Sequence, residues 1–192
     1  PYDSCRLLAM NLFSYVDNPF KPDAKFNFEK FRDHVGKAMH MMDDIIDLEL
    51  EKVELIIDKI EHDPEDMDVR RVELELWKKI RTMAQKGRRT GLGITAEGDM
   101  LAALGLRYGS QEAIDFAVEV QKTLALAAYR ASVQMAAERG PFPIYDAAKE
   151  VNNPMIARIR EADPELYEEM IKHGRRNIAM LTIAPTGTTS LM

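Results

Sequence analysis

Two short segments of the chain carry the residue types best suited to chemistry, and the first is built around Cys5. It is the single cysteine, and it lies next to Arg6. A neighbouring positive charge favours the thiolate, which is the nucleophilic and redox-active form. The alternative, a buried and unreactive cysteine, is the commoner situation and is the one that this position alone favours. One cysteine forms neither an internal disulfide nor a multi-cysteine metal site.

The second segment is a hydroxyl-rich loop that directly follows an apolar run. It consists of Pro185, Thr186, Gly187, Thr188, Thr189 and Ser190. Hydroxyls and free backbone N–H groups at the end of a strand can cradle a phosphate, especially where a helix begins. The alternative is an ordinary Ser/Thr turn at a strand end, which composition alone favours.

Acidic residues gather in one stretch, which invites the hypothesis of a carboxylate-bridged pair of metal ions. They are Asp43, Asp44, Asp47, Glu49, Glu51 and Glu54. Helix bundles that hold such metals place a Glu three residues before a His. None of the four histidines has a Glu at that position. The sequence therefore predicts a solvated helix face and no metal site.

A glycine-rich stretch contains Gly91, Gly93 and Gly98. Its spacing is not the G-x-G-x-x-G of dinucleotide-binding loops, and Gly98 is followed by Asp99 where a P-loop has lysine. Both nucleotide-binding interpretations fail, and a turn leading into a short helix is predicted here.

Composition narrows the class of protein. The chain has 192 residues, of which 46% are hydrophobic and 30% charged, and its formal net charge is -6. Lys and Arg are scattered among acidic residues, which argues against a nucleic-acid partner. No apolar run of about 18 residues spans a bilayer, and no signal peptide is recognisable, so a cytoplasmic location without membrane contact is expected. The sequence starts with proline and stops in a Thr- and Ser-rich turn, so we expect a piece of a longer protein.

The first half is predicted to be a strand followed by long helices. Residues 6–16 favour a strand that runs into a turn. Long helices are expected over residues 27–86. The first has an apolar stripe at Val35, Met39, Met42, Ile46, Leu50, Val53, Ile57 and Ile60. The second is predicted to begin at Asp63-Pro64-Glu65, which offers an N-cap and a first-turn proline, and to end in a left-handed cap at Gly87. Its stripe is Val69, Val72, Leu76, Ile80 and Met83.

Residues 87–192 are predicted to form helix-strand units. A short helix is expected over 97–104, closed by Gly105, and a long one from a Ser110 cap to Gly140. Asp163 caps a later helix, and residues 177–183 favour a strand. Helix, Gly-Arg-Arg and apolar strand occur twice, at residues 87–89 and 174–176. This α/β alternation is typical of helices outside a mainly parallel sheet or barrel, and chance similarity of the two copies is the alternative.

Three stretches, taken together, resemble the catalytic subunits of ribonucleotide reductases. They are PYDSC followed by MNL, then GRRTGLGITAEGDMLAALGLRYGS, and then GRRNIAMLTIAPTGTTSLM. The resemblance implies an α/β fold in which residues 1–192 are a helix-rich segment of a ten-stranded barrel, truncated at both ends. It also implies a reaction that removes the ribose 2′-hydroxyl of ribonucleoside di- or triphosphates by radical chemistry, with electrons from a cysteine pair.

By this resemblance Cys5 matches one member of the redox pair, and residues 185–190 match the loop that holds the substrate's phosphates. The radical-forming cysteine, its Asn and Glu neighbours and the second redox cysteine of the family are absent from this chain. Residues 1–192 alone are therefore expected to be inactive. A thioredoxin-like or other dithiol reductant is the implied partner, and assembly into an oligomer is compatible with the family.

The segment CRLLAMNL stands where many relatives have CNLGSINL. This variant looks more like the adenosylcobalamin-dependent class than the class whose radical comes from a separate metal subunit, which is the nearest alternative. A third hypothesis is a non-enzymatic helical interaction module, which the long stripes and acidic faces favour. That hypothesis leaves the loop at 185–190 unexplained.

Overall fold

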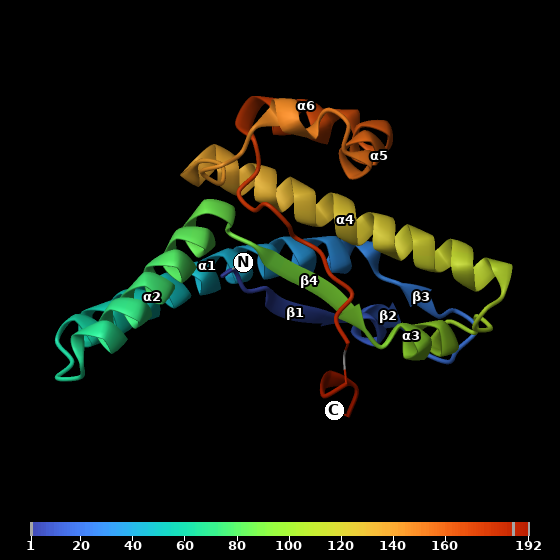
Figure 1. The fold of residues 1–192 in the computed structure, drawn as a ribbon. Helices are drawn as coiled ribbons and strands as arrows, with labels where there is room; N and C mark the ends of the chain where they lie inside the picture. The colour runs from blue at the N-terminus through green and yellow to red at the C-terminus, as the bar shows by residue number, and fades with distance from the viewer. Residues whose placement is uncertain (1, 186, 192) are drawn as a thin grey trace.

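The computed structural model describes residues 2–185 and 187–191. Its elements are stacked in layers on a small parallel sheet (Figure 1). Helix α1 (Phe28–Glu61) packs on one face of the sheet, α4 (Gln111–Arg139) crosses α1, and α5 (Pro154–Ala162) and α6 (Pro164–His173) lie beyond α4. Within the described residues the sheet does not close into a barrel.

The sheet is built from β1 (Arg6–Asn11) and β4 (Thr90–Thr95), which pair in parallel from Arg6↔Thr90 to Asn11↔Thr95. A third segment runs along the other edge of β4. Thr90 N donates to the Ala179 carbonyl at 2.9 Å, and Thr182 N donates to the Leu92 carbonyl at 3.0 Å. The strand predicted over 177–183 is thus an extended segment bonded to β4, with a parallel bridge at Leu181.

Short elements connect the layers. After β1 the chain forms a 3-10 turn, η1 (Leu12–Tyr15), and an antiparallel pair, β2 (Val16–Asp17) with β3 (Lys25–Phe26). The predicted strand over 6–16 therefore ends at Asn11. Further along lie α3 (Glu97–Ala103), the 3-10 turn η2 (Ala147–Glu150) and the terminal 3-10 turn η3 (Thr189–Leu191).

The stripe predicted for α1 is the side that packs into the core. Its N-cap Asn27 accepts a hydrogen bond from Lys30 N at 3.0 Å, which satisfies one of the free N–H groups of the first turn. All predicted stripe positions are buried except Leu50, which is half-buried. The caps predicted for α4 and α6 are also confirmed, since Ser110 accepts from Ala113 N and Asp163 accepts from Leu166 N. Helix α5 was not predicted.

Helix α2 (Met67–Gly87) begins three residues later than predicted. Its N-cap is Asp66, which accepts from Asp68 N at 2.8 Å. Asp63 instead accepts from Glu65 N at 3.1 Å, which closes a local turn. The chain needs these residues to reverse direction between α1 and α2, so Pro64 lies in the connection and not in a helix.

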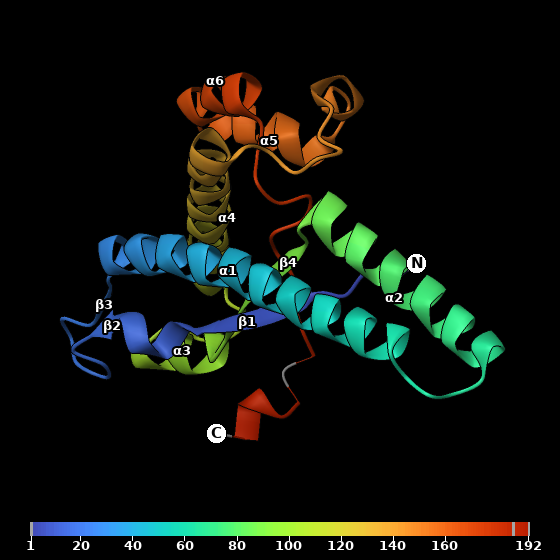
Figure 2. The same ribbon diagram turned by 90° about the vertical axis from the view of Figure 1, so that its left-hand side faces the viewer.

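The stripe predicted for α2 is exposed along its first part, and only Ile80 and Met83 near its end are half-buried. Val69, Val72 and Leu76 are 45%, 60% and 41% exposed. Helices α1 and α2 form an antiparallel hairpin that projects beyond the sheet (Figure 2). Because α2 has α1 as its main neighbour, periodicity alone could not tell which of its faces would be covered.

Both Gly-Arg-Arg segments meet at Asp43, a fully buried residue of α1. Arg88 Nε donates to Asp43 Oδ1 at 2.8 Å, Arg176 Nε donates to Asp43 Oδ2 at 3.2 Å, and Asn177 Nδ2 donates to Asp43 Oδ1 at 3.0 Å. The prediction of a solvated acidic face is therefore wrong at this position. The buried Arg88 and the half-buried Arg176 neutralise the carboxylate, which makes its burial tolerable.

The left-handed residue at the end of α2 is Arg88, with φ +45°, and not Gly87 as predicted. This conformation is unfavourable for a residue with a side chain. Arg88 is held in it by Asp43 and by Asn177 Nδ2, which donates to the Arg88 carbonyl at 3.0 Å. Gly87 serves a different need, because a Cβ there would lie 3.2 Å from Ile178 Cγ2.

Arg175, in the middle of the second Gly-Arg-Arg segment, anchors a separate part of the chain. Its guanidinium bonds both carboxylate oxygens of Glu150 in η2. It also lies over the rings of Tyr129, Phe142 and Tyr145 at 5.5 to 5.9 Å. The segment therefore ties η2 and α4 to the third strand-like segment of the sheet.

We predict that Asp43→Asn lowers the free energy of unfolding by up to about 3–5 kcal/mol, because it removes the buried counter-charge of Arg176 and leaves Arg88 with Asp47 alone. Urea denaturation followed by circular dichroism measures this. Asp44→Asn is the control, since Asp44 is 59% exposed and should change stability by less than about 1 kcal/mol. If Asp43→Asn lowers the free energy of unfolding as little as Asp44→Asn does, the buried cluster does not stabilise the fold.

Acid should remove the same stabilisation. Burial by itself raises the pKa of Asp43. Arg88 and Arg176 have a larger opposite effect through their hydrogen bonds and positive charges, and they hold the pKa below its ordinary value. The unfolded chain therefore takes up the proton first as pH falls below roughly 4. The stabilisation of the folded state by ionised Asp43 is fully present above that pH and is lost as pH falls through the folded-state pKa. The stability difference between wild type and Asp43→Asn should shrink in this range, and a difference independent of pH would contradict the assignment.

Candidate functional site

One face of the sheet is not covered by α1, and the residues that could do chemistry lie on it. Along β1 the buried side is formed by alternate residues that include Arg6 and Met10, while Leu7 on the other side is 58% exposed. We call the side away from α1 the uncovered face. Its members are Cys5, Leu7, Ala9 and Asn11 from the β1 segment and Gly91, Gly93 and Thr95 from β4.

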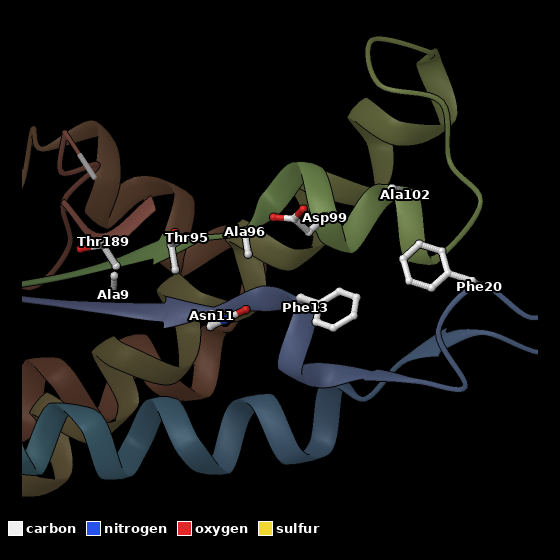
Figure 3. Close-up of a pocket in the computed structure, with 9 residues that line it drawn as sticks. All are labelled: Ala9, Asn11, Phe13, Phe20, Thr95, Ala96, Asp99, Ala102 and Thr189. Atoms are coloured by element: carbon white, nitrogen blue, oxygen red, sulfur yellow. The ribbon is translucent and has the colours of Figure 1, made fainter. Parts of the chain in front are cut away.

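A pocket of about 610 Å³ lies where β1 and β4 end. Figure 3 shows Asn11 and Thr95 at the strand ends, Asp99 on α3, and Thr189 on the opposite side beside Ala9. Phe13 and Phe20 form an apolar wall, with their ring centroids 6.1 Å apart. Ligands of parallel sheets gather at the carboxyl ends of the strands, so the position suits a binding site.

The pocket lining combines alanine and phenylalanine side chains with polar ones, and the described residues that form it include no cationic side chain. Amide and hydroxyl groups of Asn11, Thr95 and Thr189 can donate to phosphate or sugar oxygens. The carboxylate of Asp99 can accept only from a donor such as a sugar hydroxyl. An anion here would be held by hydroxyl and backbone N–H groups.

The predicted loop reaches this pocket through Thr189. Pro185, Gly187 and Thr188 are exposed, and the backbone of Ser190 lies in η3. The prediction for Thr186 and for the side chain of Ser190 falls outside the described residues. Sequence reasoning missed Asn11, Thr95 and Asp99. A signal was present, because Asn11 and Thr95 are the last residues of apolar strands and Asp99 lies in the first turn of the helix that follows β4.

Cys5 lies just before β1 on the uncovered face and is exposed. The interpretation as a buried cysteine is therefore wrong. The neighbouring Arg6 is buried on the other side of the strand. Its Nε donates to Glu49 at 2.5 Å, and its Nη1 donates to Asp3 at 3.4 Å. The charge of Arg6 is thus balanced by these carboxylates.

The turn predicted at Gly91, Gly93 and Gly98 is wrong. Gly91 and Gly93 lie inside β4, and Gly98 lies in α3. Pairing with β1 on one edge and with residues 179–182 on the other makes this stretch the central strand, which outweighs the weak strand preference of glycine. The repeat hypothesis, which expected a strand after each Gly-Arg-Arg segment, described this stretch correctly.

Among residues 2–185 and 187–191, no group of three or more His, Cys, Asp or Glu side chains is arranged to hold a metal ion. No helix in this part of the chain is long and apolar enough to cross a membrane.

Comparison with known proteins identifies relatives along the whole chain. The sequence profile of the family described as ribonucleotide reductase, barrel domain, matches residues 1–192. A vitamin B12-dependent ribonucleoside-diphosphate reductase of Thermoplasma acidophilum is 31% identical over 192 residues, which is all of this chain and 19% of that protein. A protein of the same description from Mycobacterium tuberculosis is 27% identical, again over all of this chain and 21% of its own length.

The large chain of a ribonucleoside-diphosphate reductase from Schizosaccharomyces pombe is 26% identical over 94% of this chain and 20% of its own length. The chain thus spans about a fifth of the length of the relatives that it matches.

We predict that Thr189→Val in the full-length protein weakens binding of a ribonucleoside phosphate about ten- to a hundredfold, because one hydrogen bond to a charged group is lost. Isothermal titration calorimetry measures the change. Thr82→Val is the control, since the Thr82 hydroxyl donates to Lys78 within α2, away from the pocket. Wild-type affinity in Thr189→Val would mean that residues 187–191 are an ordinary turn.

Proposed function

The chain belongs to the ribonucleotide reductase barrel-domain family, and from this premise we propose that it is part of an enzyme that reduces ribonucleoside di- or triphosphates to deoxyribonucleotides. The observation that carries the proposal is that Cys5, the pocket and the end of the 185–190 loop share one uncovered face of one sheet. A redox thiol and a site for an anionic substrate belong on the same side of a catalytic sheet.

Substrate binding is assigned to the pocket and to residues 185–190. A volume of about 610 Å³ lies within the usual range for small-molecule sites. Thr188, Thr189 and Ser190 are proposed to donate hydroxyl or backbone N–H groups to the phosphates. Pro185 would fix the exit from the preceding extended segment, and Gly187 would let the backbone approach the anion. The sugar hydroxyls would lie against Asn11 and Asp99.

Cys5 is proposed as one member of the redox pair. In the net reaction the ribose 2′-hydroxyl leaves as water, and two thiols lose two electrons and two protons to form a disulfide. A dithiol protein then restores the thiols by exchange, which requires access to one of the sulfurs. The exposure of Cys5 supports this role. A cytoplasmic location, where such reductants keep thiols reduced, is part of the proposal.

The radical source is proposed to be adenosylcobalamin, because the relatives in Thermoplasma and Mycobacterium are named vitamin B12-dependent. When bound, this cofactor would supply the radical that starts the reaction. The described residues do not identify a corrin site, since the pocket lining consists of small, aromatic and hydroxyl-bearing side chains together with Asn11 and Asp99.

The closest alternative is a large subunit that receives its radical from a separate metal-containing subunit. Relatives such as the large chain of Schizosaccharomyces pombe support it. In both cases the parallel sheet with helices on one side would be a segment of the ten-stranded barrel of the full-length enzyme.

We predict that Cys5→Ser in the full-length enzyme abolishes multiple turnover with a dithiol protein reductant. The reason is that the single remaining thiol can neither form the disulfide that supplies the two electrons nor be regenerated by exchange. Rapid-quench measurement of deoxynucleotide, with and without reductant, separates the first turnover from the later ones.

Ser4→Ala is the neighbouring control, since its hydroxyl contacts Glu49 and not the pocket. Full steady-state turnover by Cys5→Ser would show that Cys5 is structural.

A further inference from the structure

Two glycines of β4 leave room for two different functional segments. A Cβ built on Gly91 would lie 2.5 Å from Cys5 Sγ and 2.8 Å from Leu7 Cδ2, with the methyl group of Thr182 further away at 3.1 Å. A Cβ built on Gly93 would lie 2.6 Å from the Thr182 carbonyl oxygen. Real Cβ atoms essentially never approach other atoms this closely, so an alanine at either position would displace its neighbour.

Two glycines away from the uncovered face have open space around them. A Cβ at Gly36 in α1 or at Gly98 in α3 would meet nothing within 4 Å, so these positions provide matched controls. Gly174 is also crowded, since a Cβ there would lie 2.9 Å from Pro141 Cβ, but it lies at the end of α6 and not on the sheet.

We propose that Gly91 and Gly93 are positioning residues for two separate steps of the reaction. Gly91 seats the Cys5 thiol on the β4 backbone, and Gly93 admits the segment that leads into the 185–190 loop. The proposal rests on the proposed function and adds to it the reason why the central strand carries glycine where strands usually carry larger side chains.

At Gly91 the displaced atom is the end of a short side chain. Cys5 and Leu7 can rotate to make room, so Gly91→Ala is expected to fold with the thiol moved. Disulfide formation requires a narrow range of Cβ–Cβ distance and dihedral angle. A shift of about 1 Å can cost up to about a hundredfold in rate, so this variant should lose redox competence and retain substrate binding.

At Gly93 the displaced atom is a backbone oxygen. Thr182 N, in the preceding peptide unit, is hydrogen-bonded to the Leu92 carbonyl at 3.0 Å, so the chain is held against β4 at this residue. The segment itself must shift, and it reaches Pro185 three residues later. Gly93→Ala should therefore alter the loop that reaches the pocket at Thr189.

The test compares Gly91→Ala, Gly93→Ala and Gly36→Ala in the full-length enzyme. Three quantities are measured: KM for the ribonucleotide, kcat with a dithiol protein, and the alkylation rate of the Cys5 peptide by mass spectrometry. Gly91→Ala should lower kcat by up to about a hundredfold, change the alkylation rate and leave KM unchanged. Gly93→Ala should raise KM about tenfold or more and leave alkylation unchanged. Gly36→Ala should match wild type in all three.

A double mutant tests the geometry independently of turnover. Cys5→Ala removes the Sγ atom with which the Cβ of Gly91→Ala would clash. The double mutant should therefore recover part of the Tm that Gly91→Ala alone loses. If Leu7→Ala recovers it and Cys5→Ala does not, the glycine accommodates leucine and the proposal is overturned. This thermal test also decides the matter if Gly91→Ala folds poorly.

Failure of the function and failure of the inference give different results. If the wild-type enzyme forms no deoxynucleotide, the proposed function is wrong, while alkylation and thermal coupling still test whether Gly91 seats Cys5. If the wild type is active and both β4 variants behave like Gly36→Ala, the function stands and the positioning roles are refuted.

Discussion

A single buried carboxylate organises this part of the fold. Asp43, in the middle of α1, receives Arg88 from the start of the central strand and both Arg176 and Asn177 from the start of the segment beside it. A buried charge without partners would cost several kcal/mol, so the two chain segments must arrive together for α1 to pack. The similarity of the two Gly-Arg-Arg segments thus has a physical meaning, since each places an arginine on the same carboxylate.

This anchoring sets the direction of the sheet. The segments that follow Arg88 and Arg176 both leave the cluster with α1 on the same side and run parallel, with Leu92 and Met180 buried beneath them. Their carboxyl ends therefore lie on the same side of the molecule as the end of β1, and the pocket forms there. The side away from α1 keeps small residues, which allow a thiol and a backbone carbonyl to lie directly on the strand.

The division between the two faces explains how a stable scaffold and a reactive surface coexist in one small sheet. Apolar and ion-paired groups gather between the sheet and α1, where burial strengthens their interactions. The groups assigned to chemistry lie on the opposite face, where they need access to substrate and reductant. The groups around Asp43 therefore stabilise the fold, and Gly91, Gly93 and Thr189 lie on the side where the proposed reaction takes place.

The sequence by itself determined the features that depend on neighbours along the chain. The stripe of α1, the caps at Ser110 and Asp163 and the glycine stop at Gly140 were all predicted, because helical periodicity and capping are local. The resemblance to a known family, also a property of the sequence, indicated the roles expected for Cys5 and for residues 185–190.

Only the tertiary structure decided the features that depend on distant segments. It made Asp43 a buried ion-pair centre, put Gly91 in a central strand, exposed Val69 on α2 and added Asp99 to the pocket. The left-handed residue is Arg88 and not the predicted Gly87 for the same reason. Hydrogen bonds with Asp43 and Asn177, which are far away along the chain, offset the unfavourable backbone conformation of Arg88. Local preferences amount to about 1 kcal/mol per residue, whereas a buried ion pair or a strand between two neighbours involves several, so the non-local contacts prevailed.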